Sequence, residues 1–199
     1  ARLAADYFAA PLGLIIGSLV PLKVLGSKFI LPPPPPNPPA IGRDRFVLQE
    51  PDDERQVYYK SLIRAEFARR GSVFLCLPTV VDIMRTLAVL ERGISNYTVV
   101  LHRQLSTREL IKAWQRALAL THPVLIITTP AFFSLPRADI RTIIVDRENT
   151  QNYKTPQRPF LDYRRFAEYL AETLGATFVL GDTVLRTETC YRAAQGELD

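Results

Sequence analysis

The amino-acid sequence predicts an α/β protein built on a doubly wound parallel sheet, with a short N-terminal appendage. From residue 45 onwards, short apolar runs alternate with longer segments of helical periodicity, and strand and helix alternate six times. Such alternation is typical of parallel strands that are joined by helices. The run Ile143-Ile144-Val145 is apolar without interruption, as expected of a strand buried on both faces of a parallel sheet.

Each strand is predicted from a short apolar or β-branched run, and each helix from its apolar periodicity. The predicted strands are residues 45–49, 72–77, 97–101, 124–128, 142–145 and 177–180. The predicted helices are residues 54–70, 80–91, 106–118, 159–174 and 184–192, with a helical turn beginning at residue 130. Ser106 and Glu109 match a capping box, and Gly175 matches a helix C-cap.

A proline-rich stretch divides the chain. Residues 1–31 are apolar with scattered glycine and proline, and they are too few to bury a core alone. Residues 31–39 read LPPPPPNPP, which predicts a semi-rigid polyproline II spacer. A ligand for a proline-recognition module is the alternative. We therefore expect an N-terminal segment over residues 1–31, a linker over residues 32–44 and one α/β domain over residues 45–199.

Charge and cysteine content restrict the classes of function. The net charge of +5 permits a nucleic-acid partner without requiring one. Cys76 and Cys190 lie far apart, so neither a disulfide scaffold nor a zinc site is predicted, and a cytoplasmic location is expected. The uncharged run over residues 7–22 contains two prolines and is shorter than the ~20 residues of a spanning helix, so no membrane association is expected.

The loop after the first predicted strand stands where a phosphate-binding loop would. Such a loop needs glycines, whose backbone N–H groups converge on phosphate, and a lysine. This loop contains neither, and reads Glu50, Pro51, Asp52, Asp53 and Glu54. Its carboxylates repel phosphate, and Pro51 lacks an N–H group. We expect a solvated acidic turn at a helix N-terminus, with a metal site or an unusual nucleotide site as the alternatives.

Asp146 and Glu148 follow the apolar strand over residues 142–145. An acidic residue at the carboxyl end of a parallel strand lies where open α/β sheets bind ligands. In nucleotide-hydrolysing motors such a residue holds Mg²⁺, and its neighbour positions the attacking water. We interpret Asp146 and Glu148 as a degenerate motor box, because Arg147 stands between them.

Basic residues gather in loops that follow strands, where phosphate contact is plausible. The DNA-binding candidates are Arg103, Arg108, Lys154, Arg158 and Arg164. For any one of them, a solvated surface position is an equal alternative. Among the remaining candidates, Trp114 is expected in the core, and His102 is expected to be a hydrogen-bonded surface residue.

Several segments resemble the first motor lobe of the primosomal protein N′ family of replication-restart DNA helicases. They are residues 99–102 with Leu105, Ser106 and Glu109, residues 124–133, residues 143–149 with Tyr153 and Lys154, then Arg164, and finally Gly181 with Glu188 and Thr189. Residues 7–13 and 19–21 resemble the end of that family's 3′-strand-end DNA-binding domain. The resemblance implies a RecA-like lobe over residues 45–199, and the C-terminal part of a strand-end-binding domain over residues 1–31.

The departures from the family are equally informative. The phosphate-loop glycines and lysine are absent, and Arg147 replaces the first glutamate of the family's D-E-E-H box. The expected function is therefore a replication-restart protein that binds forked or junction DNA without hydrolysing ATP. Other primosome proteins are candidate partners. No cofactor is expected. The alternatives are an active ATP-dependent 3′–5′ helicase, which needs ATP and Mg²⁺, and a non-functional fragment of one.

Overall fold

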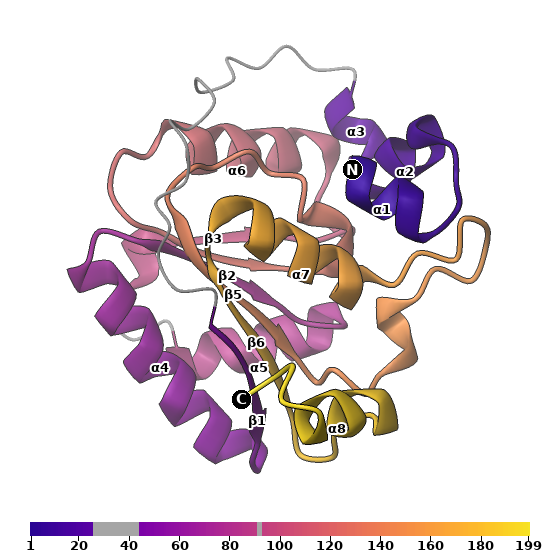
Figure 1. Cartoon of the computed structure of the whole chain (residues 1–199). Helices are drawn as coiled ribbons and strands as arrows, with labels where there is room; N and C mark the ends of the chain where they lie inside the picture. Colours follow the sequence, from indigo (N-terminus) through magenta and orange to yellow (C-terminus); the bar gives the residue numbers. More distant parts are fainter. Residues whose placement is uncertain (26–43, 91–92) are drawn as a thin grey trace.

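A computed structural model of the chain describes residues 1–25, 44–90 and 93–199. Within these residues, one six-stranded sheet lies at the centre of the molecule (Figure 1). Its strands are β1 (Arg45–Gln49), β2 (Ser72–Cys76), β3 (Thr98–Leu101), β4 (Leu125–Thr128), β5 (Ile140–Asp146) and β6 (Thr177–Asp182). The order is β1-β6-β5-β2-β4-β3, and every neighbouring pair is parallel. The predicted parallel sheet is confirmed.

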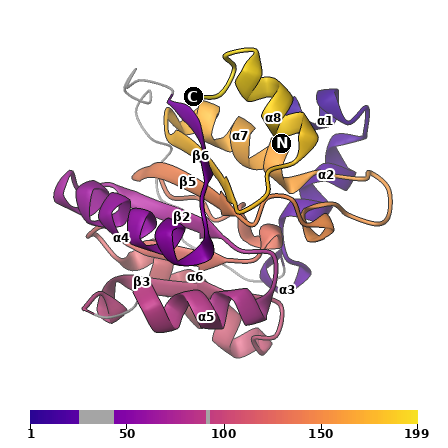
Figure 2. The same ribbon diagram turned by 90° about the horizontal axis from the view of Figure 1, so that it is seen from below.

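Helices cover both faces of the sheet, so the doubly wound prediction is also confirmed. The larger helices are α4 (Asp52–Ala68), α5 (Val80–Leu90), α6 (Thr107–Ala119), α7 (Tyr163–Leu174) and α8 (Thr187–Ala194). Figure 2 shows α4 and α5 on one side of the sheet and α7 on the other. Leu75 packs with the α4 and α5 side, whereas its neighbour Phe74 packs with the side that contains Trp114 of α6. Successive side chains of strand β2 point to opposite faces of the sheet. Because helices cover both faces, β2 is buried along its whole length.

The N-terminal segment packs on the α6 and α7 side of this domain. It forms α1 (Arg2–Tyr7), α2 (Leu12–Leu19) and α3 (Leu22–Leu25). Ala4, Ile15 and Leu19 are buried in the same apolar cluster as Trp114. The guanidinium of Arg165 on α7 lies 5.1 Å from the ring centre of Tyr7. The appendage thus contributes to the core of the α/β domain. The predicted linker over residues 32–44 lies outside the described residues, except for residue 44.

Several predicted boundaries need correction, and each has a local cause. The helix predicted over residues 159–174 begins at Tyr163, because the Asp162 side chain caps it by accepting from the backbone N–H of Arg164. The helix predicted over residues 184–192 is Thr187–Ala194, and the strand predicted to begin at residue 142 begins at Ile140. His102, expected at the surface, is buried.

Other local predictions hold. Ser106 and Glu109 form the capping box of α6, and Gly175 ends α7 in the left-handed region at φ 63°. Trp114 is buried, as predicted, and Cys76 is buried as well. In the part of the chain that the structure describes, no helix has the length and apolar character needed to cross a membrane.

The topology places a crevice at the carboxyl ends of β2 and β5, the position where open α/β sheets bind ligands. These strands are neighbours at the centre of the sheet. The helix that follows β2 is α5, on one face, whereas the helix that follows β5 is α7, on the other. Because the two connections diverge, the loops after β2 and β5 leave a crevice between them. The candidate site lies along this edge.

Candidate nucleotide edge and nucleic-acid groove

Asp146, the first residue of the degenerate motor box, is held by partners from the same chain. Its Oδ1 accepts hydrogen bonds from Arg55 Nε and Tyr59 Oη, each at 2.8 Å. Its backbone carbonyl accepts a third from Tyr153 Oη at 2.6 Å. Burial raises the pKa of Asp146, although the hydrogen bond and charge of Arg55 oppose this effect. The carboxylate is therefore enclosed in the protein instead of facing a ligand.

Arg55, on the first turn of α4, is the residue at this edge that sequence reasoning missed. It is 1% exposed. Besides Asp146, its guanidinium donates to the Glu50 carbonyl at 2.5 Å, Thr183 Oγ1 at 3.0 Å and Asp52 Oδ1 at 2.7 Å. The acceptors come from the β1–α4 loop, the start of α4, the end of β5 and the segment after β6. The only signal in the sequence is one arginine three residues after an aspartate in an acidic run.

Gly181 on β6 allows the close approach of Tyr59 to this edge. A Cβ atom at residue 181 would lie 1.9 Å from Tyr59 Oη and 3.3 Å from Asp146 Oδ1. Only glycine leaves room for the hydroxyl that bonds Asp146. Gly181 thus has a local packing role at this edge.

The acidic loop forms the first turn of α4. Pro51 is the N-cap residue, and Asp52, Asp53 and Glu54 follow it in the first turn. Carboxylates at this end of a helix are stabilised by the helix dipole. Repulsion from the nearby Glu50 raises the pKa of Glu54. The turn brings several negative charges together on the side where a phosphate-binding loop would carry N–H donors.

Arg147 and Glu148, which follow Asp146, also form internal contacts. Arg147 forms ion pairs with Asp52 and, at 3.5 Å, with Asp82. Glu148 is fully buried, and its Oε1 accepts from the backbone N–H of Arg186 at 2.6 Å. Arg186 is the N-cap residue of α8, so Glu148 satisfies a helix N-terminus from another part of the chain. Burial raises the pKa of Glu148.

The charged side chains that line the space remaining at this edge are mainly acidic. A cavity of about 320 Å³ lies beside the box, and its charged lining residues are Asp52, Asp82, Asp182 and Arg147. Three carboxylates face one guanidinium, which disfavours an anionic ligand. Asp146, the residue that would hold the metal, is bound to Arg55. Among the described residues, no group of three or more His, Cys, Asp or Glu side chains is placed to hold a metal ion.

A second cavity, of about 560 Å³, lies along the carboxyl ends of β2 to β5. We call it the basic groove. Its lining includes Thr79, Arg103, Gln104, Asn152 and Lys154. Arg103 and Lys154 are exposed, and neither forms an ion pair with any residue that the structure describes. Two of the five DNA-binding candidates therefore lie together with their charges available.

The other three candidates lie elsewhere. Arg108 is exposed on the first turn of α6, and Arg158 is exposed in the loop before α7. Arg164 is 5% exposed, and its guanidinium donates to Asp162 and to the backbone carbonyls of Glu148 and residue 150. Arg164 does not line the basic groove, and its donors are already used inside the fold.

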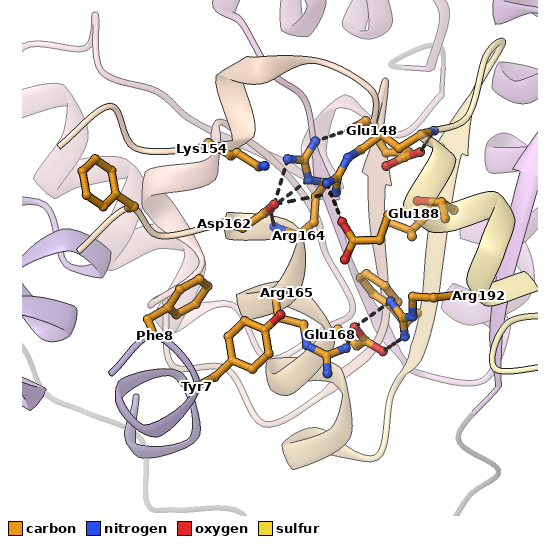
Figure 3. A pocket seen from close by; sticks show the side chains of 15 residues that line it. Tyr7, Phe8, Glu148, Lys154, Asp162, Arg164, Arg165, Glu168, Glu188 and Arg192 are labelled. Carbon is orange, nitrogen blue, oxygen red and sulfur yellow. Dashed lines mark hydrogen bonds and ion pairs between the residues drawn. The ribbon is translucent and has the colours of Figure 1, made fainter. Parts of the chain in front are cut away.

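A third cavity, of about 300 Å³, is shown in Figure 3. It lies between α1, α7 and α8, and most of its charged side chains pair with one another. Arg164 binds Asp162, and Arg192 binds Glu168. Lys154 lines this cavity as well as the basic groove. We call it the charged cavity. The pair between Arg192 and Glu168 connects α8 to α7, whereas Arg164 pairs with the N-cap residue of its own helix.

Comparisons with known proteins identify the fold. No protein-family model matches the chain, and no curated protein sequence matches it. Among solved structures, the C-terminal domain of S. cerevisiae Dbp5, bound to Gle1 and IP6, is similar with a TM-score of 0.54 and 11% identity, over 79% of this chain and 88% of that one. Domain 2 of the DEAD-box helicase Mss116p, bound to an RNA duplex, is similar with a TM-score of 0.51 and 10% identity. The match covers 70% of this chain and 54% of that one. The chain has the fold of a RecA-like helicase domain.

Proposed function

We propose that this chain is a helicase-type lobe that binds nucleic acid without hydrolysing ATP, and that it recognises forked or junction DNA in replication restart. The observation that carries the first part is the bond between Arg55 and Asp146, at 2.8 Å. It puts a buried guanidinium against the carboxylate that a motor needs for Mg²⁺. The acidic first turn of α4 adds negative charge where phosphate would bind.

The basic groove supports the nucleic-acid part of the proposal. It lies at the carboxyl ends of the strands, where open α/β sheets bind ligands, and Arg103 and Lys154 bring two available cations. Gln104, Asn152 and Thr79 add side chains that can hydrogen-bond to phosphate and sugar oxygens. Domain 2 of Mss116p, which shares the fold, is bound to an RNA duplex. The choice of DNA, and the role at replication forks with primosome proteins as partners, rests on the sequence resemblance.

The N-terminal segment supplies a second part of the proposed DNA interface. Residues 7–13 and 19–21 resemble the end of a strand-end-binding domain. Tyr7 is exposed, and its ring contacts Arg165 on α7. We propose that residues 1–31 are the C-terminal part of such a domain, which would deliver the strand end beside the lobe.

Calorimetric titration with ATP and Mg²⁺ tests the claim of inactivity. We expect no saturable heat at millimolar ATP, because Asp146 and Glu148 are both used inside the fold. Micromolar binding that requires Mg²⁺ would contradict the claim. DNA-stimulated phosphate release that is abolished by Asp146→Ala would support the active helicase instead.

Binding of a forked DNA, measured across a series of salt concentrations, tests the nucleic-acid part. We expect tighter binding to the fork than to blunt duplex of equal length, with affinity that falls steeply as salt rises. Equal affinity for both DNAs would indicate a lobe that binds nucleic acid in general, and would contradict the role at replication forks. If the protein binds neither fork, duplex nor single-stranded DNA at low salt, the result would support the alternative of a non-functional fragment.

A further inference from the structure

We infer that the oxygen atoms around Arg55 form a guanidinium-binding site, which the chain fills with its own side chain. We call this the Arg55 site, and it consists of Asp52 Oδ1, Asp146 Oδ1, Thr183 Oγ1 and the Glu50 carbonyl. The bound guanidinium ties the start of α4 to β5 and to the segment after β6. This edge of the lobe is thereby held in one arrangement with no ligand from solution.

The acceptors match the shape of a guanidinium group. Nε, Nη1 and Nη2 of Arg55 all donate, and the four bonds are between 2.5 and 3.0 Å long. A guanidinium presents its N–H donors in one rigid plane, whereas an ammonium is a point charge. The site is 1% exposed at the arginine, so water does not supply alternative partners. Two carboxylates, those of Asp146 and Asp52, pair with the cation, and Arg147 also pairs with Asp52.

The same geometry disfavours a metal ion at this site. Mg²⁺ requires near-octahedral oxygen ligands at about 2.1 Å and keeps several waters. Asp146 Oδ1 already accepts the Tyr59 hydroxyl, and Tyr59 is itself held against Gly181. Two of the acceptors, Thr183 Oγ1 and the Glu50 carbonyl, are neutral. A flat organic cation therefore fits this cavity better than a small hard ion.

The Arg55 site joins segments of the fold that are distant in the sequence. The acceptors are as far as 128 residues from Arg55 in the sequence. In a helicase motor, nucleotide and Mg²⁺ contact the phosphate loop and the acidic box at the same time. Here one side chain spans the corresponding segments permanently.

The experiment is replacement of the arginine by free guanidinium. We would measure Tm for the wild type, Arg55→Ala and Arg55→Lys in 0–20 mM guanidinium chloride, with sodium chloride at equal concentration as reference. Arg55→Ala should lower Tm by about 10 °C, since it leaves Asp146 buried and unpaired. Guanidinium should then raise Tm of this variant by a few degrees with saturation. Arg55→Lys should be less destabilised and should not respond.

The matched control is Arg108→Ala, which removes an exposed arginine from α6. Its Tm, like that of the wild type, should not rise with guanidinium, which at these concentrations is too dilute to denature. A response of all variants alike, no response of Arg55→Ala, or a larger response of Arg55→Ala to Mg²⁺ would each overturn the proposal.

If Arg55→Ala does not fold, recovery of its near-ultraviolet circular dichroism on adding guanidinium replaces Tm as the readout. Failure to recover would count against the site. The double variant Arg55→Ala with Asp146→Asn should be more stable than Arg55→Ala alone, because no buried charge is left unpaired. These stability measurements do not require DNA binding, so their failure and the failure of the proposed function can be told apart.

Discussion

The candidate nucleotide edge, which consists of Asp52, Arg55, Asp146 and Arg147, lies at the same end of the sheet as the basic groove. The two regions use their charges in opposite ways. At the nucleotide edge, Arg55 and Arg147 each bind a carboxylate. In the basic groove, Arg103 and Lys154 are exposed and have no ion pair among the residues that the structure describes. The same residue types therefore hold the fold together in one place and remain available in the other.

Solvation explains the difference. A buried charge must be paired, because removing it from water costs several kcal/mol. An exposed cation costs little and exchanges its counterions for phosphate. The comparison predicts that substitutions at the nucleotide edge change stability and those in the groove change nucleic-acid affinity.

The largest effect is expected at the centre of the nucleotide edge. Asp146→Ala should destabilise the fold by about 3–5 kcal/mol, since Arg55 is left buried with its main charge partner removed. Chemical denaturation measures the change. Asp53→Ala is the control, because Asp53 is exposed on the same turn and its loss should cost well under 1 kcal/mol. Similar values for the two variants would show that the edge is not a buried ion-pair site.

A second test uses Glu168 in the charged cavity, which bonds Arg45, Arg165 and Arg192. Burial alone would raise the pKa of Glu168, but the hydrogen bonds and charges of Arg192 and Arg165 outweigh it and lower the pKa. The ion pairs therefore stabilise the fold above the unfolded-state pKa of about 4.3, and this contribution is lost as pH falls through the folded-state pKa.

Glu168→Gln should consequently cost about 2 kcal/mol at pH 7. The difference in the free energy of unfolding between variant and wild type should disappear at low pH. Unfolding experiments at a series of pH values would measure it. Glu172→Gln is the control, because Glu172 is more exposed and bonds only Arg45 among the described pairs. A gap that stays constant with pH would mean that Glu168 acts through packing and not through its charge.

Gly181→Ala should destabilise the fold by about 2 kcal/mol, because the added methyl displaces the Tyr59 hydroxyl from Asp146. Gly17→Ala on α2 is the matched control. A Cβ there has no neighbour within 4 Å, and alanine favours a helix, so this variant should be neutral or more stable. Urea denaturation would measure the free energy of unfolding of both variants. A loss in Gly181→Ala alone would show that the effect comes from close packing and not from replacing any glycine by alanine.

The smallest expected effect on stability, and the largest on binding, comes from the groove. Replacing Arg103 and Lys154 together by alanine should weaken fork binding about tenfold, and should reduce the slope of log K against log salt by about 1.5. Tm should stay the same. Replacing Lys60 and Arg64 on α4 removes the same charge far from the groove. An equal loss of affinity in that control would show that net charge, and not the groove, binds the nucleic acid.

The sequence by itself determined the fold class and most of its elements. The Ile143-Ile144-Val145 run predicted a central strand, and β5 is buried over that run. Ser106, Glu109 and Gly175 predicted helix ends that the structure has. These signals are local, because a strand period, a cap or a left-handed residue involves only near neighbours in the chain.

Only the tertiary structure decided which charges are used internally. In the sequence, Arg55 is one cation in an acidic run, and Arg164 looks as available as Lys154. The partner of Arg55 is Asp146, which lies 91 residues away, and Glu148 caps a helix whose first N–H donor is 38 residues further on. Burial and long-range pairing set the role of a charged residue, and neither leaves a periodic or local signal in the sequence.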